Sequence, residues 1–225
     1  MNPLKHPIRE IRDGWDPLQE SSRNFILIAH RARTSPDFPL DDPCGAGGRW
    51  DAVARCVNSA LFLSHNLRRD TSIHIILLGP PEPPKTLTVN GGRVKYLNPD
   101  ERSTVALLGK ALSIGSEVLG NYRWVTPGIY IKKGGLDTVL NSIQGRLFLL
   151  DEKGKDIRSM EGSIKDKSER SYFLLSDDMN PSDRETETIL SHMMGMISLG
   201  PKIIHSHHAI TLVHNTLDRM EQVMK

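Results

Sequence analysis

The sequence lacks several features that define common classes of protein. It has only two cysteines, Cys44 and Cys56, which are too few for a disulfide framework and fit a reducing compartment. It contains no run of about 18 apolar residues, and its first residues, MNPLKHPIREIRDGWD, lack the apolar core of a signal peptide. We therefore expect no structural disulfide, no membrane span and a cytoplasmic location.

Two kinds of binding motif are also missing. No Gly-x-Gly-x-x-Gly follows a strand pattern and no P-loop occurs, so neither a Rossmann cofactor site nor a P-loop is predicted.

Histidines gather near the end of the chain, at His192, His205, His207, His208 and His214. Adjacent helical residues point in different directions and no cysteine lies nearby, so we expect no metal site.

The residues that are present fit one globular domain. The chain has 225 residues, of which 38% are hydrophobic and 25% are charged, so a buried core can form. Residues 1–150 carry 19 Lys and Arg against 14 Asp and Glu, whereas residues 151–225 carry 10 against 13. A basic face suits a polyanionic partner such as RNA, although this imbalance alone is equally compatible with chance.

Strand and helix patterns alternate along the chain. Apolar runs predict strands at 24–32, 71–79, 128–134, 146–150, 171–178 and 196–200, and a hairpin that joins 86–89 to 93–97 around Asn90-Gly91-Gly92. Helical spacing predicts helices at 49–67, 98–115, 136–143, 181–194 and 207–224.

The order of these elements predicts an α/β fold with a mostly parallel sheet. Residues 24–225 would form a single domain, preceded by an N-terminal arm at 1–23 that we expect to be flexible. Asn98 is expected to cap one helix, and Ser182 with Glu185 forms a capping box for another. Residues 33–48 and 151–170 are expected to be loops.

Polar or turn residues follow three of the predicted strands. They lie in LLDEKG at 149–154, in LLSDD at 174–178 and in SLGPK at 198–202. Ligands of open α/β sheets bind beyond the carboxyl ends of strands, so the three segments could form one pocket. Taken alone, they fit ordinary strand-to-loop turns better than a pocket.

A second candidate site lies at the start of the predicted helix 49–67. Arg49 could bind an anion and Asp51 could accept a proton, but Asp51 could instead stabilise the helix dipole and pair with Arg55. A further charged cluster near the other end of this helix consists of Arg68, Arg69 and Asp70. Such a cluster suits contacts to an RNA backbone, or a solvated surface.

Four longer motifs occur in the order GGRWDAVARCVNSALFLSHNLRRD, NPDER, TPGIY and SLGPKIIHSHHAITLVHN. Together they closely resemble the archaeal tRNA pseudouridine N1-methyltransferases, a family of the SPOUT class, over roughly residues 24–220. The resemblance implies a SPOUT-like fold with a C-terminal trefoil knot at about 146–225, a homodimer, and S-adenosyl-L-methionine as cofactor. It also implies methylation of N1 of a pseudouridine in the T-arm of tRNA.

The resemblance further implies site residues. The cofactor contacts would be Leu150, Ser176, Leu199, Gly200, Pro201, Lys202, Ile203, Ile204 and Ala209. Arg49 and Asp51 resemble an Arg-x-Asp pair at a helix start, so Asp51 is the first candidate for the catalytic base and Asp70 the second. The N1–H of pseudouridine is a weak acid, and a nearby carboxylate that takes its proton makes N1 more nucleophilic. Candidate contacts to the RNA phosphates are Arg55, Arg68, Arg69, Lys132 and Lys133.

The sequence departs from the family pattern at two positions. Ser176 stands where the family often has glycine, and Ala209 where it often has cysteine. One alternative is therefore an RNA-binding relative that has lost its cofactor site. Another is a methyltransferase whose substrate is ribosomal RNA or plain uridine. Binding of S-adenosyl-L-methionine distinguishes the first, and mass spectrometry of treated RNA distinguishes the second.

Overall fold

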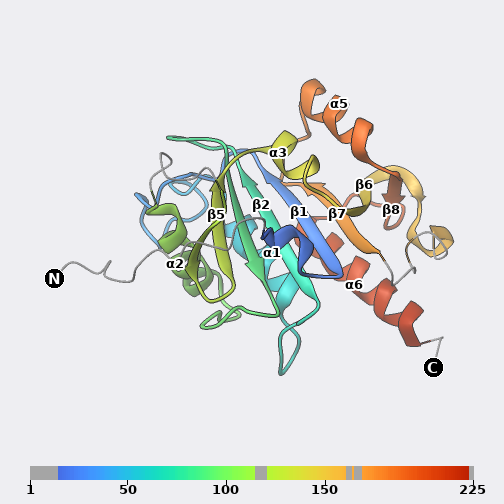
Figure 1. Cartoon of the computed structure of the whole chain (residues 1–225), viewed down its shortest axis with the longest axis horizontal. Coiled ribbons are helices and arrows are strands. Elements are labelled where there is room, and N and C mark those ends of the chain that lie inside the picture. The colour runs from blue at the N-terminus through green and yellow to red at the C-terminus, as the bar shows by residue number, and fades with distance from the viewer. Residues whose placement is uncertain (1–14, 115–120, 161–163, 165–168, 223–225) are drawn as a thin grey trace.

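A single sheet organises the chain (Figure 1). The computed structural model describes residues 15–114, 121–160, 164 and 169–222. Within these ranges the strands are β1 (Arg23–Ala29), β2 (Thr71–Leu77), β3 (Lys85–Asn90), β4 (Arg123–Thr126), β5 (Ile129–Lys133), β6 (Gly145–Asp156), β7 (Arg170–Ser176) and β8 (Gly195–Ser198). They form one eight-stranded sheet in the order β4-β5-β3-β2-β1-β7-β6-β8.

The sheet is mixed, with its parallel pairings gathered in one part. β1 pairs in parallel with β2 and β7, and β6 pairs in parallel with β7 and β8. β3, β5 and β4 continue the sheet in antiparallel fashion beyond β2. The expected α/β fold is confirmed, whereas the parallel arrangement is limited to β2, β1, β7, β6 and β8, which are neighbours in the sheet. The carboxyl ends of these strands share one edge, where the predicted strand-end segments lie.

Helices cover both faces of the sheet (Figure 1). α1 (Trp50–Leu61), α2 (Glu101–Leu112) and α6 (Ser206–Gln222) pack their apolar side chains on one face, in the larger hydrophobic core. α3 (Leu136–Leu140), α5 (Asp183–His192) and a short 3-10 turn, η1 (Pro17–Gln19), contribute to a smaller core on the other face. A second 3-10 turn, η3 (Ile157–Met160), follows β6.

The structure corrects several predicted elements. The hairpin around Asn90 is wrong, because the chain after β3 coils instead: the Asn90 carbonyl accepts from the backbone N–H of Val94 at 2.8 Å, and β3 pairs with β2 and β5. α1 ends at Leu61 rather than at residue 67, since the following Phe62 is extended. α2 is capped by Asp100 rather than Asn98, because the Asp100 side chain accepts from the Ser103 N–H.

Other boundaries also differ from the prediction. β6 continues to Asp156, where a loop was expected, and β4 was not predicted. The capping box is confirmed, with Ser182 accepting from the N–H of Glu185 and the Glu185 side chain accepting from the N–H of Ser182. Residue 115 of one predicted helix, residues 223 and 224 of another, and most of 161–168 lie outside the described residues.

The last part of the expected arm packs onto the domain. Leu18 is fully buried, and the Tyr172 hydroxyl donates to its carbonyl at 2.7 Å. The Trp15 ring lies 4.8 Å from the ring of Tyr130, measured between centroids. Residues 1–14 lie outside the described residues, so the proposed boundary between arm and domain stays a prediction.

A buried ionic junction attaches α6 to the amino end of β1. The Arg23 guanidinium donates to His214 Nδ1 at 2.7 Å and to Asp218 at 3.0 Å. His214 Nε2 lies 3.0 Å from the carbonyl oxygen of Ala60 and donates to it, which leaves Nδ1 free to accept. Burial, aided by Arg23 and Arg68, lowers the pKa of His214 to about 3, so this ring is neutral.

His74, in the centre of β2, gives a measurable pH dependence of stability. Its side chain is fully buried, and burial lowers its pKa to about 3 from an ordinary 6.5. The unfolded chain therefore binds a proton that the folded chain refuses, so stability is lost as pH falls below 6.5. We expect His74 to account for about 2 kcal/mol of lost unfolding free energy between pH 6.5 and pH 5.

Urea unfolding of the protein and of His74→Gln, at both pH values, measures this contribution. Glutamine cannot take up the proton, so the pH-dependent loss should be smaller in the variant by that amount. The same substitution at His65, which is exposed, should leave the loss unchanged. An equal loss in His74→Gln and in the unaltered protein would contradict the assignment.

Candidate functional site

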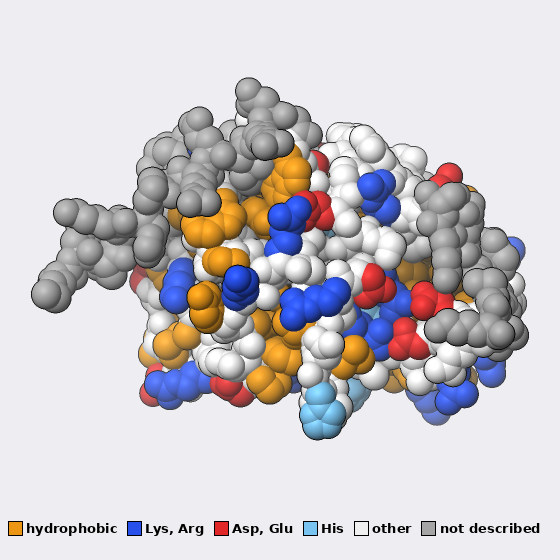
Figure 2. All heavy atoms as spheres, turned by 60° about the horizontal axis from the view of Figure 1, so that its bottom comes forward, with side chains coloured by type: hydrophobic (Ala, Val, Ile, Leu, Met, Phe, Trp, Pro, Cys, Tyr) orange, Lys and Arg blue, Asp and Glu red, His pale blue; other side chains and the backbone are white. Residues whose placement is uncertain are grey.

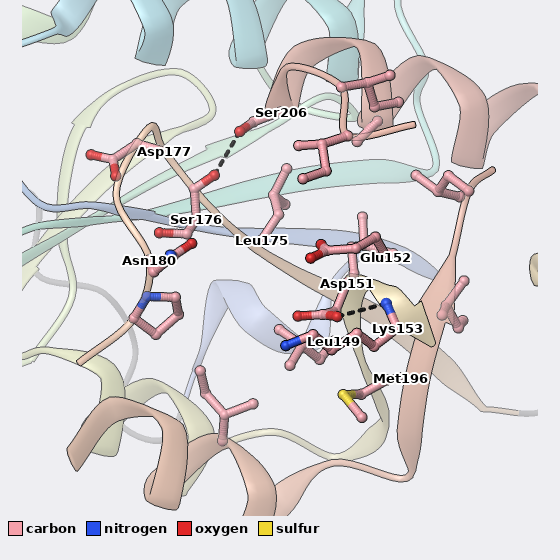
Figure 3. A pocket seen from close by; sticks show the side chains of 18 of the residues that line it. Leu149, Asp151, Glu152, Lys153, Leu175, Ser176, Asp177, Asn180, Met196 and Ser206 are labelled. Carbon is pink, nitrogen blue, oxygen red and sulfur yellow. Dashed lines mark hydrogen bonds between the residues drawn. The ribbon is translucent and has the colours of Figure 1, made fainter. Parts of the chain in front are cut away.

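A cavity of about 440 Å³ opens at the carboxyl ends of β6, β7 and β8 (Figure 3). We call it the strand-end cavity. Its apolar side chains include Leu149, Leu150, Leu175, Ile197 and Leu199, and its polar ones include Asp151, Glu152, Asp177 and Asn180. Ser206, at the start of α6, donates to the Ser176 carbonyl at 2.6 Å and so ties α6 to the end of β7.

The structure brings the predicted cofactor residues together in this cavity. Eight of the nine line it, namely Leu150, Ser176, Leu199, Gly200, Lys202, Ile203, Ile204 and Ala209. Pro201 is exposed and is not part of the lining. The Ser176 hydroxyl donates to the Met179 carbonyl at 2.5 Å, so this polar side chain is satisfied within its own turn.

A bulge in β6 forms the opposite wall. Leu150 and Lys155 both align with Ile197 of β8, so the four residues between them loop out of the pairing. A Cβ at Gly154 would lie 2.5 Å from the Ile197 nitrogen, so the bulge requires glycine there. Asp151 accepts from the backbone N–H of Lys153 at 2.8 Å inside the bulge (Figure 3). The bulge therefore places two carboxylates, Asp151 and Glu152, at the cavity.

A second cavity, of about 450 Å³, lies next to the first. We call it the arginine cavity, because Arg49, which precedes α1, and Arg55 of α1 line it together with three histidines. The two cavities share a wall made of Asp177, Asn180, Ile203, Ile204 and Ser206. The two cavities therefore adjoin, and ligands bound in them would be neighbours.

Arg49 enters the arginine cavity from a strained backbone. It precedes α1 with φ 74°, a left-handed conformation that is uncommon for residues other than glycine. Gly48 has φ 69°, and a Cβ there would lie 2.0 Å from the Arg31 carbonyl oxygen. The Arg49 guanidinium donates to Asp178 at 2.6 Å and to Asp51 at 3.1 Å. Strain at this position is typical of functional sites.

Asp51 is held between two guanidinium groups. It accepts from Arg49 and from Arg55, the residue one helical turn later. Burial raises the pKa of Asp51, but the hydrogen bonds from Arg49 and Arg55 outweigh it, so the net pKa lies below the ordinary value. The carboxylate is thus firmly ionised, which makes it a good anchor for Arg49 and a weak proton acceptor.

Three histidines at the start of α6 complete the arginine cavity. The ring centroids of His207 and His208 lie 4.0 Å apart, and His205 lies 5.7 Å from His207. Burial, with smaller contributions from His208, Arg55 and His205, lowers the pKa of His207 to about 4. The His207 ring is therefore neutral at pH 7 and can accept a hydrogen bond.

Most of the other predicted site residues lie elsewhere. Asp70 precedes β2 at the amino edge of the sheet, opposite both cavities, and accepts from Thr71. Arg68 is paired with Asp218 at 2.6 Å, and Arg69 donates to the Gly91 carbonyl at 2.9 Å. Of the five predicted RNA contacts, only Arg55 lines either cavity.

The two predicted lysines have structural partners. Lys132 is buried with its ammonium 4.3 Å from the centroid of the Tyr122 ring, and burial lowers its pKa. Lys133 donates to the carbonyls of Glu82 and Pro83 at 2.9 and 3.0 Å. Neither side chain belongs to the part of the molecule that carries the cavities.

Sequence reasoning missed other residues of the site. Asp151, Glu152, Asp177 and Asn180 line the strand-end cavity without having been singled out. All four follow predicted strands within the quoted segments or directly after them, so a search for polar residues beyond strand ends would have found them. In the described residues, no cluster of three or more metal-ligating side chains is found. No helix there has the length and apolar character that crossing a membrane requires.

Comparison with known proteins gives consistent relatives. Residues 22–222 match a family model described as "Putative SAM-dependent RNA methyltransferase". A tRNA (pseudouridine(54)-N(1))-methyltransferase of Methanosarcina acetivorans is 45% identical, over 88% of this chain and 92% of that protein. One of Methanococcoides burtonii is 44% identical, over 88% and 96%. The crystal structure of Archaeoglobus fulgidus Nep1 bound to S-adenosylhomocysteine has the same fold, with a TM-score of 0.59 at 16% identity over 90% of this chain and 99% of that one.

Gly48 provides a test of the strained approach to α1. We expect Gly48→Ala to lower the free energy of unfolding by about 2 kcal/mol or more, because the new Cβ meets a backbone carbonyl at a positive φ. Gly109→Ala is the matched control. Gly109 lies within α2 and a Cβ there has nothing within 4 Å, so alanine should stabilise the helix by about 0.5–1 kcal/mol. Denaturant unfolding compares the two, and equal stability of Gly48→Ala and the unaltered protein would refute the strain argument.

Proposed function

Because the chain belongs to the family of SAM-dependent RNA methyltransferases, we propose that it methylates N1 of pseudouridine 54 in tRNA. The observation that carries this proposal is the pair of cavities that share one wall. In the proposal, the strand-end cavity takes the methyl donor and the arginine cavity takes the nucleobase. Methyl transfer needs donor and acceptor in contact and aligned, and two adjoining cavities can hold them in this way.

The strand-end cavity fits S-adenosyl-L-methionine by its chemistry. Leucine and isoleucine side chains suit an adenine ring, and the carboxylates of Asp151 and Glu152 suit ribose hydroxyls or the amino group. Asp177 brings a third negative charge, which suits a sulfonium cation. When bound, S-adenosyl-L-methionine supplies an electrophilic methyl group. Ser176 does not obstruct this fit, because its hydroxyl is engaged with Met179.

Arg49 is the proposed catalytic residue in the arginine cavity. N1 forms its bond to the methyl group as the bond between that methyl and the donor sulfur breaks, and the N1 proton passes to water. Loss of this proton leaves negative charge on the base, and a guanidinium beside it stabilises that charge. Asp51 and Asp178 hold Arg49 from two sides, so its position is set before the base arrives. Asp51 therefore orients Arg49 in this proposal, rather than taking the N1 proton itself. Full turnover by Asp51→Asn would remove Asp51 from the mechanism.

The RNA must present an unstacked base to the arginine cavity. Arg55, which lines the cavity, is the proposed phosphate contact nearest the reacting base. Figure 2 brings forward the bottom of Figure 1, where the amino ends of β1 and β2 lie, and shows separate lysine and arginine side chains among apolar and acidic ones there, away from both cavities. Spaced cations of this kind suit contacts to several phosphates along a folded RNA.

The trefoil knot, the homodimer and the cytoplasmic location belong to the same proposal. The segments around 150, 177 and 200 converge on one cavity, and α6 then returns beneath the sheet to pack on α1. This path supports a knot in residues 146–225. A crystal structure in which the last segment does not thread through the preceding loop would contradict it. Modification of tRNA is consistent with a cytoplasmic enzyme.

The activity can be tested directly. Purified protein, S-adenosyl-L-methionine and tRNA that carries pseudouridine 54 should give N1-methylpseudouridine, detected by mass spectrometry of nuclease digests. Arg49→Ala should lower kcat by about a hundredfold and leave the dissociation constant of the donor nearly unchanged, because Arg49 does not line the strand-end cavity. Methylation of unmodified uridine or of ribosomal RNA alone would overturn the proposed substrate, and absence of donor binding would overturn the enzyme.

The proposed homodimer has a separate test. Large apolar side chains are exposed at Leu190, Met194, Ile203 and Leu212, all in the last part of the chain, and an interface with a second copy could bury them. Sedimentation should give twice the mass of one chain. Leu212→Asp, on α6, should shift the protein towards monomer, whereas Leu63→Asp, at an exposed position after α1, should not. A monomeric unaltered protein would refute the dimer.

A further inference from the structure

His30 lies directly after β1, between two carboxylates. Its Nδ1 is 2.9 Å from an oxygen of Asp177, and its Nε2 is 3.3 Å from an oxygen of Glu185. The His30 side chain is 12% exposed, and those of Asp177 and Glu185 are 4% and 17% exposed. The group is thus largely removed from water and joins the ends of β1 and β7 to the start of α5.

Both ring nitrogens of His30 face acceptors. A neutral imidazole carries one N–H and can donate to only one of the two carboxylates, whereas an imidazolium donates to both. The Ser176 hydroxyl, 3.4 Å from Nδ1, is the other polar group at the ring. The adjacent residues Arg31 and Asp178 are paired with each other, and Asp178 also accepts from Arg49. The geometry therefore favours a charged His30.

The carboxylates around His30 strengthen this assignment. The hydrogen bond with Asp177 raises the pKa of His30, burial opposes it, and Glu185 adds to the rise, with a net shift above the ordinary value. The pKa values of Asp177 and Glu185 are both lowered, against the effect of burial, in part by His30. These shifts favour the charged form of all three groups.

Asp177 links His30 to both cavities. It lines the strand-end cavity and the arginine cavity, and its side chain accepts from the backbone N–H of His30 at 2.7 Å and of Met179 at 3.0 Å. Glu185 also accepts from Ser182 in the capping box of α5. His30 thus holds the turn at 176–180 on one side and the start of α5 on the other.

We propose that His30 is a positioning residue, which as an imidazolium fixes the Asp177 turn that lines both cavities where they adjoin. The proposal rests on the proposed function of the two cavities. It goes beyond that function because it makes the position of the Asp177 turn depend on the charge of His30. His30 does not line either cavity, so it acts through Asp177 and not by touching a ligand.

The pH dependence follows from the sign of the charge. The support is complete while His30 is protonated and is lost as pH rises through its raised pKa in the folded protein. Asp177 and Glu185 stay ionised throughout that range. Loss of the proton would leave two carboxylates facing a neutral ring, so we expect donor affinity to weaken about tenfold across the transition, the size of one charge-assisted hydrogen bond.

The charge of His30 can be measured without any ligand. Nuclear magnetic resonance of ¹⁵N-labelled imidazole rings, recorded between pH 5 and pH 9, should show His30 titrating above the ordinary 6.5, with both nitrogens protonated at neutral pH. Glu185→Gln should lower that pKa. A ring that is already neutral at pH 6 would overturn the proposal.

Calorimetric titration with S-adenosyl-L-methionine over the same pH range tests the link to the cavity. His30→Asn keeps one donor but no charge, and should bind the donor about tenfold more weakly near neutral pH. His30→Arg keeps a permanent cation, and should retain affinity while losing the pH step assigned to His30. His65→Asn, at an exposed histidine, should behave like the unaltered protein.

The outcomes separate the two proposals. If the unaltered protein binds the donor and His30→Asn binds it equally well at every pH, the inference is overturned and the proposed function stands. If the unaltered protein does not bind the donor, the proposed function fails, and the support of a donor site by His30 fails with it. A uniform loss in His30→Asn and His30→Arg, with both folded by circular dichroism, would indicate a packing role and would also overturn the inference.

Discussion

The parallel pairing of β1 with β7 places two consecutive cations opposite two consecutive carboxylates. His30 and Arg31 leave the end of β1, and Asp177 and Asp178 leave the end of β7. Asp177 enters the wall of both cavities, while Asp178 also binds Arg49. The relative position of the two strands thus determines where the turn at 176–180 lies and where the proposed catalytic arginine points. This register is set by backbone hydrogen bonds between two strands whose central residues are buried.

The site lies at the edge of the sheet where regular buried strands end beside segments of irregular backbone. β1 and β7 are buried and regular, whereas β6 interrupts its pairing with β8 to extend a bulge over the strand-end cavity. On the other side, Gly48 and Arg49 adopt left-handed conformations where α1 begins. Such local departures from regular geometry cost free energy, and they persist because the surrounding core specifies them. The β6 bulge and the Gly48–Arg49 turn each border one of the two cavities, which fits a functional role for this region.

Much of the fold could be predicted because the patterns that specify it are local. Apolar runs located the strands, and Ser182 with Glu185 announced the start of α5 three residues apart. The strand-end cavity could also be predicted, since its residues follow such runs and the family motifs indicate the same positions. The failed hairpin shows the limit of this approach. Asn90-Gly91-Gly92 has the composition of a tight turn, but β5, some 40 residues later, supplies the partner for β3.

The positions of charged side chains were the least predictable part. Arg68 looks free in the sequence and is paired with Asp218, 150 residues away. Lys132 follows an apolar strand pattern and is buried against the Tyr122 ring. Nothing in the local sequence indicates that contact. Asp70 is close in sequence to Arg68 and Arg69, yet the direction of β2 places it at the wrong edge of the sheet. Sequence reveals the sign of a charge, whereas only the tertiary structure shows its partner.

The common wall of the two cavities has a thermodynamic consequence. If occupancy of one side shifts the turn at 176–180 in a way that alters affinity on the other, the converse must hold by the same factor. Product release would then depend on both cavities, because the first product to leave changes the affinity with which the second is held. This coupling needs no domain movement, since the few residues that line both cavities transmit it.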